Sequence, residues 1–459
     1  MPLSVTNTLR RESPFASRSF TSYFKYYHLV SVVVVVVVNM FSSVVIHASF
    51  PASNVMITGG GSSLSEEVHK ALGQQFSISH FQNNIELIYQ PVGSTLGLSN
   101  LLSISTTTPY DYAASESIPS NEQFSQNPGT QVLPFVGTNI LVIYNLPELS
   151  SNDPQLILDR TLLVNIFAGK ITNWNDPSIA ALNPSIASRL PNTPIQRVVR
   201  SDSSGTTHIF TSALTAFAAD SKGETTWYLG DTSLPSEWPN ESPSSISKQK
   251  GSVGVSNYVI LTPYTIAYQT PDTLYEHTYA KIINAAGNAV SPTTKSCQNA
   301  MDDFKDAFDS KFTANIVNAK GAESYPISGY SYIVYKSSSM PDCNVGKVLY
   351  RYFVYLYSSA SEETITEAKF VPLSSSIRNR IVNDYLSKWV CASTESVVTI
   401  DFDLSAPIAL AVVGGIVALT CLGIVLGVSI YARIRKRAMI GDLLVDEEEE
   451  PKGNVANKN

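Results

Sequence analysis

Small hydroxyl or acidic side chains stand at four places where an apolar strand pattern gives way to a helix or loop. The four stretches are TGGGSSL (58–64), QPVGST (90–95), AASES (113–117) and RSDSSGTT (200–207). The first N–H groups of a helix have no partner inside the helix, and the helix dipole makes that end positive. Glycines let a ligand approach the backbone closely, and hydroxyls add further donors. Arg200 adds a planar guanidinium that matches a tetrahedral oxyanion. Together the stretches predict a site for a small anion.

Each stretch also has a purely structural interpretation. A Ser or Thr before a helix commonly acts only as an N-cap. The GGGSS segment (59–63) is also compatible with a flexible linker, and Arg200 with a surface ion pair to Asp202. The occurrence of all four stretches in one chain favours the anion site.

The elements that must position these stretches alternate short apolar strands with amphipathic helices, which predicts an α/β fold. We expect strands at 55–58, 85–89, 112–115, 139–146 and 196–200. We expect helices at 63–76, 94–103, 156–169 and 206–219, the third of them ending on Gly169. Residues 233–250 are rich in Ser and Pro and predict a loop. A chain of 459 residues is too long for one ordinary core, so two lobes or domains are expected.

The quoted stretches, together with NILVIYNLPEL, IFAGKITNWNDPSIAALNP, AKIINAAGNAVSP and ESYPISGYSYIVYK, carry a resemblance to a known family. From about residue 54 to about residue 390 the chain resembles the high-affinity phosphate-binding proteins of bacterial phosphate ABC transporters, in the two-lobed periplasmic binding-protein superfamily (type II). The resemblance implies a mixed sheet in each lobe and a hinged cleft between the lobes. It places lobe 1 at 51–135 and 327–395, and lobe 2 at 136–326.

The resemblance also implies which residues contact the ligand. In lobe 1 the family's contacts match Ser63, Leu64 through its backbone N–H, Ser94 and Glu116. In lobe 2 they match Arg200, Ser204, Gly205 and Thr206. Asp202 matches the aspartate that holds the family's arginine in place.

Glu116 departs from the family pattern, which has an aspartate at this position. A buried carboxylate accepts a hydrogen bond from the proton of monohydrogen phosphate, whereas it repels the unprotonated sulfate. Glutamate keeps this chemistry and adds one methylene, so we expect selectivity for phosphate to persist while the affinity is left open. In the alternative, Glu116 points to solvent and the site has drifted.

Two apolar segments predict contact with a membrane. Residues 29–48 follow a basic stretch and predict a signal peptide, 1–48, cleaved near Ala48, or else an uncleaved signal anchor. Residues 407–432 are long enough to span a bilayer, and Arg433 follows at once with further basic residues. We therefore expect a single-pass type I membrane protein, with an extracellular or lumenal ectodomain, a tether at 396–406 and a cytoplasmic tail at 433–459.

The composition narrows the classes of ligand and cofactor that the protein is expected to bind. The net charge of −7 and the absence of a basic stripe argue against nucleic acid. Four cysteines occur, at 297, 343, 391 and 421, and the last lies in the expected membrane span. The other three predict one disulfide and one leftover thiol. Their spacing matches no zinc site, so we expect neither a metal nor another cofactor.

The function that we expect is binding of inorganic phosphate without chemistry, for capture, uptake or sensing. Expected partners are phosphate, membrane lipid around the one helix, and a phosphate transporter or signalling protein. One alternative is a phosphomonoesterase-like enzyme using Ser204 and His208, although we favour a packing role for His208. The other alternative is a surface interaction or adhesion module that has lost its ligand.

Overall fold

The computed structural model describes residues 55–80, 85–103, 110–271, 276–337 and 342–390. All of them belong to one compact unit, Met1–Val398. The expected signal segment (1–48), tether (396–406), membrane span (407–432) and tail (433–459) lie outside the described residues. Within the described ranges, every helix is too short or too polar to cross a membrane.

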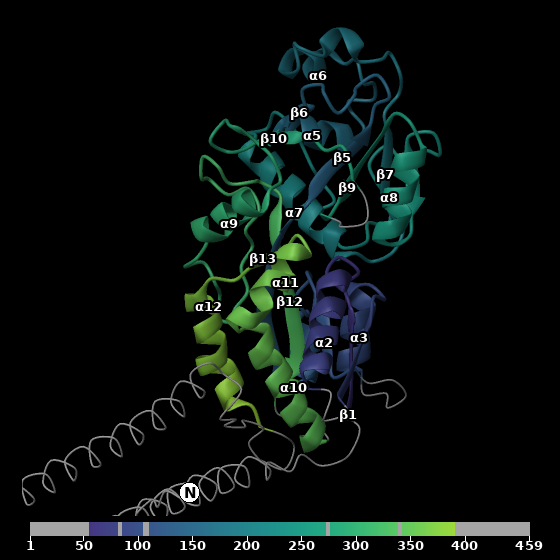
Figure 1. Ribbon diagram of the computed structural model, residues 1–459. Helices are drawn as coiled ribbons and strands as arrows, with labels where there is room; N and C mark the ends of the chain where they lie inside the picture. Colours follow the sequence, from purple (N-terminus) through teal and green to yellow (C-terminus); the bar gives the residue numbers. More distant parts are fainter. Residues whose placement is uncertain (1–54, 81–84, 104–109, 272–275, 338–341, 391–459) are drawn as a thin grey trace, which may run out of the picture. The chain divides into compact units, whose positions relative to one another are not determined.

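The first sheet is mixed and has the strand order β13-β4-β12-β3-β1-β2 (Figure 1). Strand β1 pairs in parallel with both β2 and β3, while β12 pairs antiparallel with β3 and β4, and β13 antiparallel with β4. The strands are β1 (Val55–Gly61), β2 (Ile85–Gln90), β3 (Tyr112–Ser115), β4 (Thr130–Asn139), β12 (Ser328–Lys336) and β13 (Val371–Pro372).

The second sheet is also mixed and has the order β5-β9-β7-β8, and a small third sheet has the order β11-β10-β6. Strand β7 is parallel to β8 and β9, and β5 is antiparallel to β9. The strands are β5 (Leu141–Asn145), β6 (Ile157–Asp159), β7 (Gln196–Arg200), β8 (Ile246–Gln249), β9 (Thr265–Gln269), β10 (Lys281–Ile283) and β11 (Ala289–Val290).

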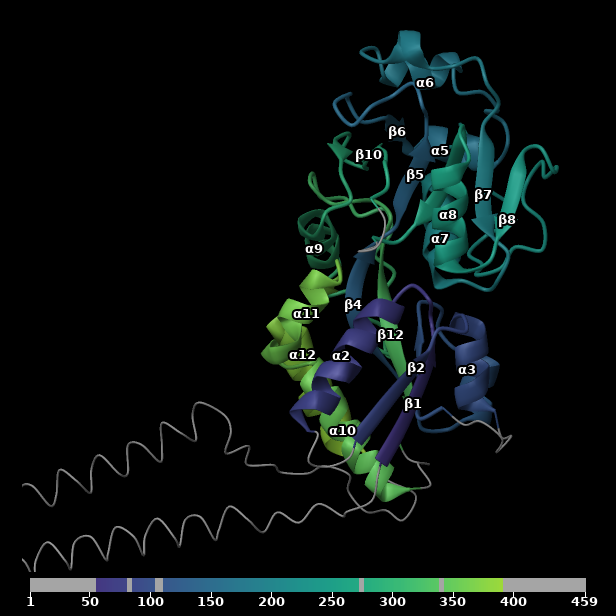
Figure 2. The ribbon, with the colours of Figure 1, turned by 45° about the vertical axis from the view of Figure 1, so that its right-hand side comes forward.

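The longer helices cover the sheets with apolar faces, as α10 illustrates. In α10 the buried side chains include Val348, Leu349, Tyr352, Phe353 and Leu356, which form one stripe at helical spacing. Figure 2 shows α2 and α3 on either side of β1 and β2. Helix α2 connects β1 to β2, whereas α3 connects β2 back to β3 on the other side of β1, and right-handed crossovers in opposite directions place the two helices on opposite faces of the sheet.

The helices are α2 (Glu66–Ser79), α3 (Ser94–Leu102), α4 (Asn121–Gln126), α5 (Arg160–Phe167), α6 (Pro177–Leu182), α7 (Gly205–Asp220), α8 (Gly251–Leu261), α9 (Thr294–Asp303), α10 (Cys343–Leu356), α11 (Glu362–Glu367) and α12 (Ser375–Arg380). Short 3₁₀ turns span Ala187–Arg189, Ser359–Ser361 and Leu386–Lys388, and one π-helical turn spans Ile381–Tyr385.

The chain changes sheet at two places that touch. Strand β4 ends one residue before Ile140 and β12 starts one residue after Ile327, and the Ile140 N–H donates to the Ile327 carbonyl at 2.7 Å. We use "lobe 1" for the first sheet with its helices and "lobe 2" for the second. The lobe boundaries expected from the resemblance stay a prediction. Helix α9 lies within 136–326, the range expected for lobe 2, but it packs against β4 and β12 of the first sheet.

Three element predictions were wrong in part. The strand expected at 139–146 is the end of β4 followed by β5, because the chain passes from one sheet to the other. The helix expected at 156–169 begins only at Arg160, since Ile157–Asp159 pairs with β10 and Asp159 caps the helix. The expected loop 233–250 contains β8, which pairs with β7. Gly169 does follow the helix end, with φ of 67°.

Two cysteines lie within the described residues. Cys297 is buried and free, and Cys343 is disulfide-bonded. Both states agree with the expected single disulfide and one leftover thiol.

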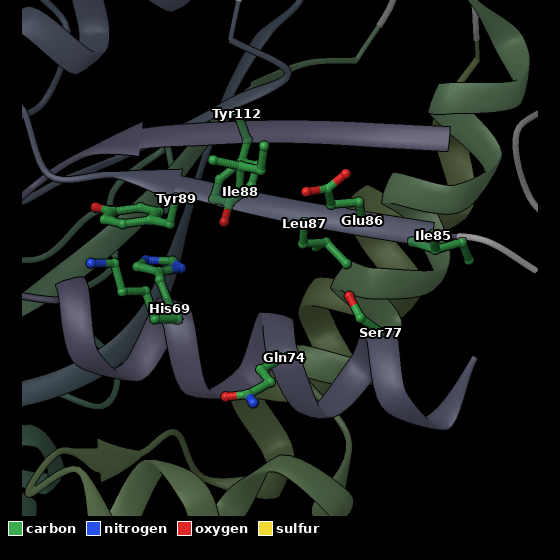
Figure 3. Close-up of a pocket in the computed structure, with 10 residues that line it drawn as sticks. His69, Gln74, Ser77, Ile85, Glu86, Leu87, Ile88, Tyr89 and Tyr112 are labelled. Atoms are coloured by element: carbon green, nitrogen blue, oxygen red, sulfur yellow. The ribbon is translucent and has the colours of Figure 1, made fainter. Parts of the chain in front are cut away.

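His69 of α2 is buried without a hydrogen-bond partner for either ring nitrogen. Its ring stacks on Tyr89 and Phe135, with centroids 4.6 and 4.8 Å apart. It lies at one end of a hollow of about 260 Å³ between α2 and β2 (Figure 3). Burial lowers the pKa of His69 from 6.5 to about 3, so the imidazole is neutral in the folded protein.

We expect this neutral histidine to make folding sensitive to acid. Between pH 6.5 and about 3 the unfolded chain binds a proton at residue 69 that the folded chain does not. The free energy of unfolding should therefore fall as the pH drops through this window, by up to about 1.4 kcal/mol per pH unit from this residue. His69→Phe should flatten the decline in urea unfolding at several pH values. His80→Phe, at the end of the same helix, is the control. An unchanged pH profile for His69→Phe contradicts the prediction.

Candidate anion-binding site

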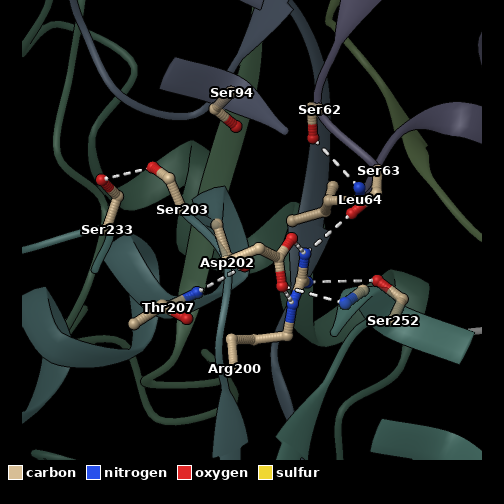
Figure 4. Close-up of polar contacts among 12 residues, drawn as sticks. Ser62, Ser63, Leu64, Ser94, Arg200, Asp202, Ser203, Thr207, Ser233 and Ser252 are labelled. Atoms are coloured by element: carbon tan, nitrogen blue, oxygen red, sulfur yellow. Dashed lines mark hydrogen bonds and ion pairs between the residues drawn. The ribbon is translucent and has the colours of Figure 1, made fainter. Parts of the chain in front are cut away.

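The four polar stretches come together between the two lobes. The parallel strands β1, β2 and β3 end on one edge of the first sheet, where they deliver Ser63, Ser94 and Glu116. Strand β7 of the second sheet ends on Arg200, and α7 begins five residues later. Figure 4 shows residues of both lobes facing one another around the Arg200 side chain.

Arg200 forms the centre of the polar contacts and is only 3% exposed. Its Nε donates to Asp202 Oδ1 at 2.8 Å, and its Nη2 lies 2.5 Å from Asp202 Oδ2. Nη2 also donates across the lobes to Ser63 Oγ at 3.1 Å, and Nη1 donates to Ser252 Oγ at 3.4 Å. The ion pair with Asp202 exists, but the alternative that it lies on the surface is wrong.

Asp202 is held as a carboxylate against the Nε and Nη2 atoms of Arg200. The Gly251 N–H at the start of α8 donates to its Oδ1 at 2.9 Å. Burial alone raises the pKa of Asp202, but the hydrogen bonds and charge of Arg200, with the Gly251 N–H, lower it overall. Asp202 therefore fixes the orientation of the guanidinium and offsets part of its charge.

The first turn of α7 presents unused donors. Ser204 is the N-cap, and its Oγ accepts the Thr207 N–H at 3.2 Å. The N–H groups of Gly205 and Thr206 come first in this 16-residue helix, where no intrahelical acceptor is available to them. The Thr206 hydroxyl is buried and has no hydrogen-bond partner. A buried hydroxyl without a partner is costly, so it indicates a ligand or water at this point.

Leu64 differs from the expectation drawn from the resemblance. Its N–H donates to Ser62 Oγ at 3.0 Å, within the turn between β1 and α2. That donor is therefore engaged inside the protein in this structure, while the neighbouring Ser63 hydroxyl faces Arg200 (Figure 4).

Glu116 is buried, with 3% of its surface exposed, so the alternative that it points to solvent is wrong. Its Oε2 accepts the Ser94 hydroxyl at 3.0 Å, and its Oε1 accepts the Ser331 hydroxyl at 2.8 Å. Burial raises the pKa of Glu116, while hydrogen bonds from Ser62, Ser331 and Ser94 oppose the rise. The carboxyl group lies against the start of α7, because a Cβ at Gly205 would be 1.6 Å from Oε2.

Direct contacts between the lobes enclose this region. Thr95 Oγ1 of α3 lies 2.5 Å from Ser203 Oγ, which in turn lies 3.1 Å from Ser233 Oγ. Gly93, with φ of 96°, approaches so closely that a Cβ there would be 2.8 Å from the Ser203 carbonyl oxygen. These contacts hold the two lobes close together around the donors.

A second cavity, of about 400 Å³, adjoins the site beyond Glu116. His208, Asp231 and Tyr330 are among the residues that line it. Burial lowers the pKa of His208, and the charge of Asp231 partly opposes this. Within the described part of the chain, His208 and Ser204 are joined only by the backbone hydrogen bond of the helix, at 3.0 Å, and not through their side chains. In the same residues, no cluster of three or more His, Cys, Asp or Glu side chains could hold a metal ion.

The sequence reasoning missed four residues that support the site. Ser62 and Ser331 hold Glu116, Ser252 contacts Arg200, and the Tyr268 hydroxyl accepts the Arg200 N–H at 3.2 Å. Ser331 and Tyr268 come from strands far along the chain. Only Ser62 belongs to one of the four stretches, and Ser331 stands within a motif that carried the resemblance.

Several known proteins are similar to this chain. A family model of the PBP superfamily domain matches residues 48–358. The phosphate-binding protein PstS of Haemophilus influenzae is 29% identical over 344 residues, which cover 72% of this chain and 92% of that protein. A solved human phosphate-binding apolipoprotein aligns with a TM-score of 0.56 at 20% identity, covering 74% of this chain and 98% of that one. At this identity the structural likeness supports the fold alone.

A much longer relative matches only in part. A protein of Acanthamoeba polyphaga mimivirus, named as a serine/threonine-protein kinase/receptor, is 30% identical over 271 residues, or 56% of this chain. This chain spans 16% of the length of that protein and 15% of a second one of the same kind.

Proposed function

The chain belongs to the PBP superfamily, and we propose that it binds inorganic phosphate between its two lobes. The observation that carries the proposal is the pairing of buried Arg200 with unused donors at the start of α7, among them the partnerless Thr206 hydroxyl. Phosphate has four oxygens and accepts several hydrogen bonds, and both the guanidinium and a helix start favour it. The name of the Haemophilus influenzae relative supports the same ligand.

We assign the ligand contacts to both lobes. Lobe 1 supplies the Ser63 hydroxyl, Ser94 and the Glu116 carboxylate, and lobe 2 supplies the Arg200 guanidinium. The Ser94 hydroxyl donates to the ligand only if it leaves Glu116 Oε2. The remaining donors are at Ser204, Gly205 and Thr206. A role for the Leu64 N–H requires it to leave Ser62 Oγ when the ligand binds. Because each lobe holds part of the site, the ligand stabilises the closed arrangement only when both sets are intact.

The test is calorimetric titration of the purified full-length chain with phosphate and, separately, with sulfate. Micromolar or tighter binding of phosphate without heat from sulfate is the expected result. Absence of heat with both anions would overturn the proposal and favour an interaction module that has lost its ligand. Turnover of a phosphate monoester that disappears in Ser204→Ala would favour an enzyme instead.

Glu116→Gln should relax the discrimination against sulfate. The carboxylate accepts the proton of monohydrogen phosphate and repels an unprotonated oxyanion, whereas an amide is neutral and can donate. We expect the ratio of phosphate to sulfate affinity to fall by about a hundredfold or more. Glu241→Gln, which alters a carboxylate paired with Lys248 outside the site, is the control. Wild-type discrimination in Glu116→Gln would show that our role for this residue is wrong.

We further propose that the chain works as a type I membrane protein, with residues 1–48 as a signal and 407–432 as the membrane helix. Phosphate sensing is a second candidate role beside capture for a transporter, because a domain similar to this chain occurs in a longer protein named as a kinase/receptor. Protease protection of the tail in sealed membrane vesicles tests the topology. Cross-linking with and without phosphate would identify a transporter or a signalling partner.

A further inference from the structure

Ser331 lies at an irregularity in the first sheet, and its hydroxyl contacts the Glu116 carboxylate. Between Ser331 and Tyr332 the pairing of β12 with β4 shifts register, so that Ser331 faces Val136 and Tyr332 faces Pro134. Such bulges redirect side chains and are common beside functional sites. Ser331 is completely buried, and on its other side β12 pairs with β3, the strand that ends immediately before Glu116.

The Ser331 hydroxyl is within hydrogen-bond distance of the Glu116 carboxylate and of the Ser65 hydroxyl. Ser331 Oγ lies 2.8 Å from Glu116 Oε1 and 3.2 Å from Ser65 Oγ. A serine has one hydroxyl proton, and an ionised carboxylate only accepts. Ser331 is the donor in both contacts, and the shorter distance makes Glu116 Oε1 the preferred acceptor of its single proton.

Both oxygens of Glu116 are thus fixed from different elements. Ser94 of α3 donates to Oε2 and Ser331 of β12 donates to Oε1. A carboxylate offers about four acceptor positions, and the Ser94 and Ser331 hydroxyls occupy one on each oxygen, so the group can still receive a proton from a ligand. The position of the carboxyl group against Gly205 places it at the first turn of α7.

We propose that Ser331 is a positioning residue that sets the selectivity of the site. It holds the longer glutamate side chain so that the carboxylate keeps a free acceptor position toward the ligand, and the site then takes an oxyanion that carries a proton. The proposal rests on phosphate being the ligand. It explains how a glutamate can stand where the resembling family has an aspartate.

The test compares Ser331→Ala with the wild-type full-length chain by calorimetry, using phosphate and sulfate. We expect phosphate affinity to fall about tenfold to a hundredfold and the phosphate-to-sulfate ratio to fall with it, because the carboxylate loses its fixed orientation. Ser331→Cys fills the site that alanine leaves empty and weakens the donor, so it should shift the ratio in the same direction even where alanine lowers stability. Ser361→Ala, another completely buried serine, with its hydroxyl on the Leu356 carbonyl, is the matched control.

A double-mutant cycle separates positioning from general packing. In a Glu116→Asp background the shorter side chain no longer reaches Ser331, so adding Ser331→Ala should leave the selectivity ratio unchanged. An equal effect of Ser331→Ala in both backgrounds, or an unchanged ratio in the wild-type background, would overturn the inference. Absence of phosphate binding by the wild-type chain is a different result, because it removes the proposed function itself.

Discussion

Arg200→Ala is expected to abolish detectable phosphate binding. Arg200 is 3% exposed, and its guanidinium faces Ser63 of the other lobe. It is the charged hydrogen-bond donor of the proposed site, and the Ser63 and Thr206 hydroxyls are neutral donors beside it. Truncating one partner of a buried, hydrogen-bonded charge pair in a complex costs about 2–5 kcal/mol of binding free energy, which corresponds to a loss of affinity of about thirtyfold to several thousandfold. The loss is compounded because Asp202, left without its partner, repels the anion. Calorimetric titration measures the loss, and circular dichroism checks that the variant is folded.

Arg189→Ala is the matched control for this variant. Arg189 makes a similar two-pronged pair, with Nη1 and Nη2 donating to Asp153 at 2.8 and 2.5 Å, but it lies at the surface. It should bind phosphate like the wild type. If Arg200→Ala is folded and retains an affinity within a few-fold of the wild-type chain, the anion does not lie on Arg200 and the proposed site is misplaced.

Local patterns were sufficient for most elements around the site. The strand predicted at 112–115 and the helix predicted at 206–219 match β3 and α7, because each has a strong period and a clear cap or turn at its end. The errors arose where distant pairing decides the structure. Ile157–Asp159 forms a strand only because β10, more than a hundred residues later, lies beside it.

In the site, too, contacts between neighbours in sequence could be predicted, whereas contacts between residues far apart in sequence could not. That Arg200 pairs with Asp202 could be predicted, since the two residues are neighbours in sequence. That Ser331 holds Glu116 could not be predicted, because 215 positions separate them and a register shift in β12 decides where the serine points. The Leu64 N–H shows a third case, in which a carried-over role competes with a hydrogen bond to Ser62 inside the same turn.

Gly205→Ala should remove phosphate binding by overpacking the contact between the lobes. The added Cβ would be 1.6 Å from Glu116 Oε2 and 2.4 Å from its Cδ, so the carboxylate must move away from the first turn of α7. Overpacking of a close contact costs about 1–3 kcal/mol, and loss of the carboxylate position adds to it, so we expect about a hundredfold weaker binding. Alanine favours a helix over glycine, so α7 itself should be stable. Titration with phosphate and thermal unfolding give the two measurements.

Two further variants isolate the cause. Gly254→Ala changes a glycine of α8 whose added Cβ would meet its nearest atom at 3.7 Å, so it should bind like the wild type. Combining Gly205→Ala with Glu116→Ala removes the carboxyl group that the new methyl displaces. The double variant should therefore bind phosphate no more weakly than Glu116→Ala alone, although without selectivity against sulfate. If the two changes instead weaken binding additively, Gly205 acts through its own backbone N–H and not through the space that it leaves for Glu116.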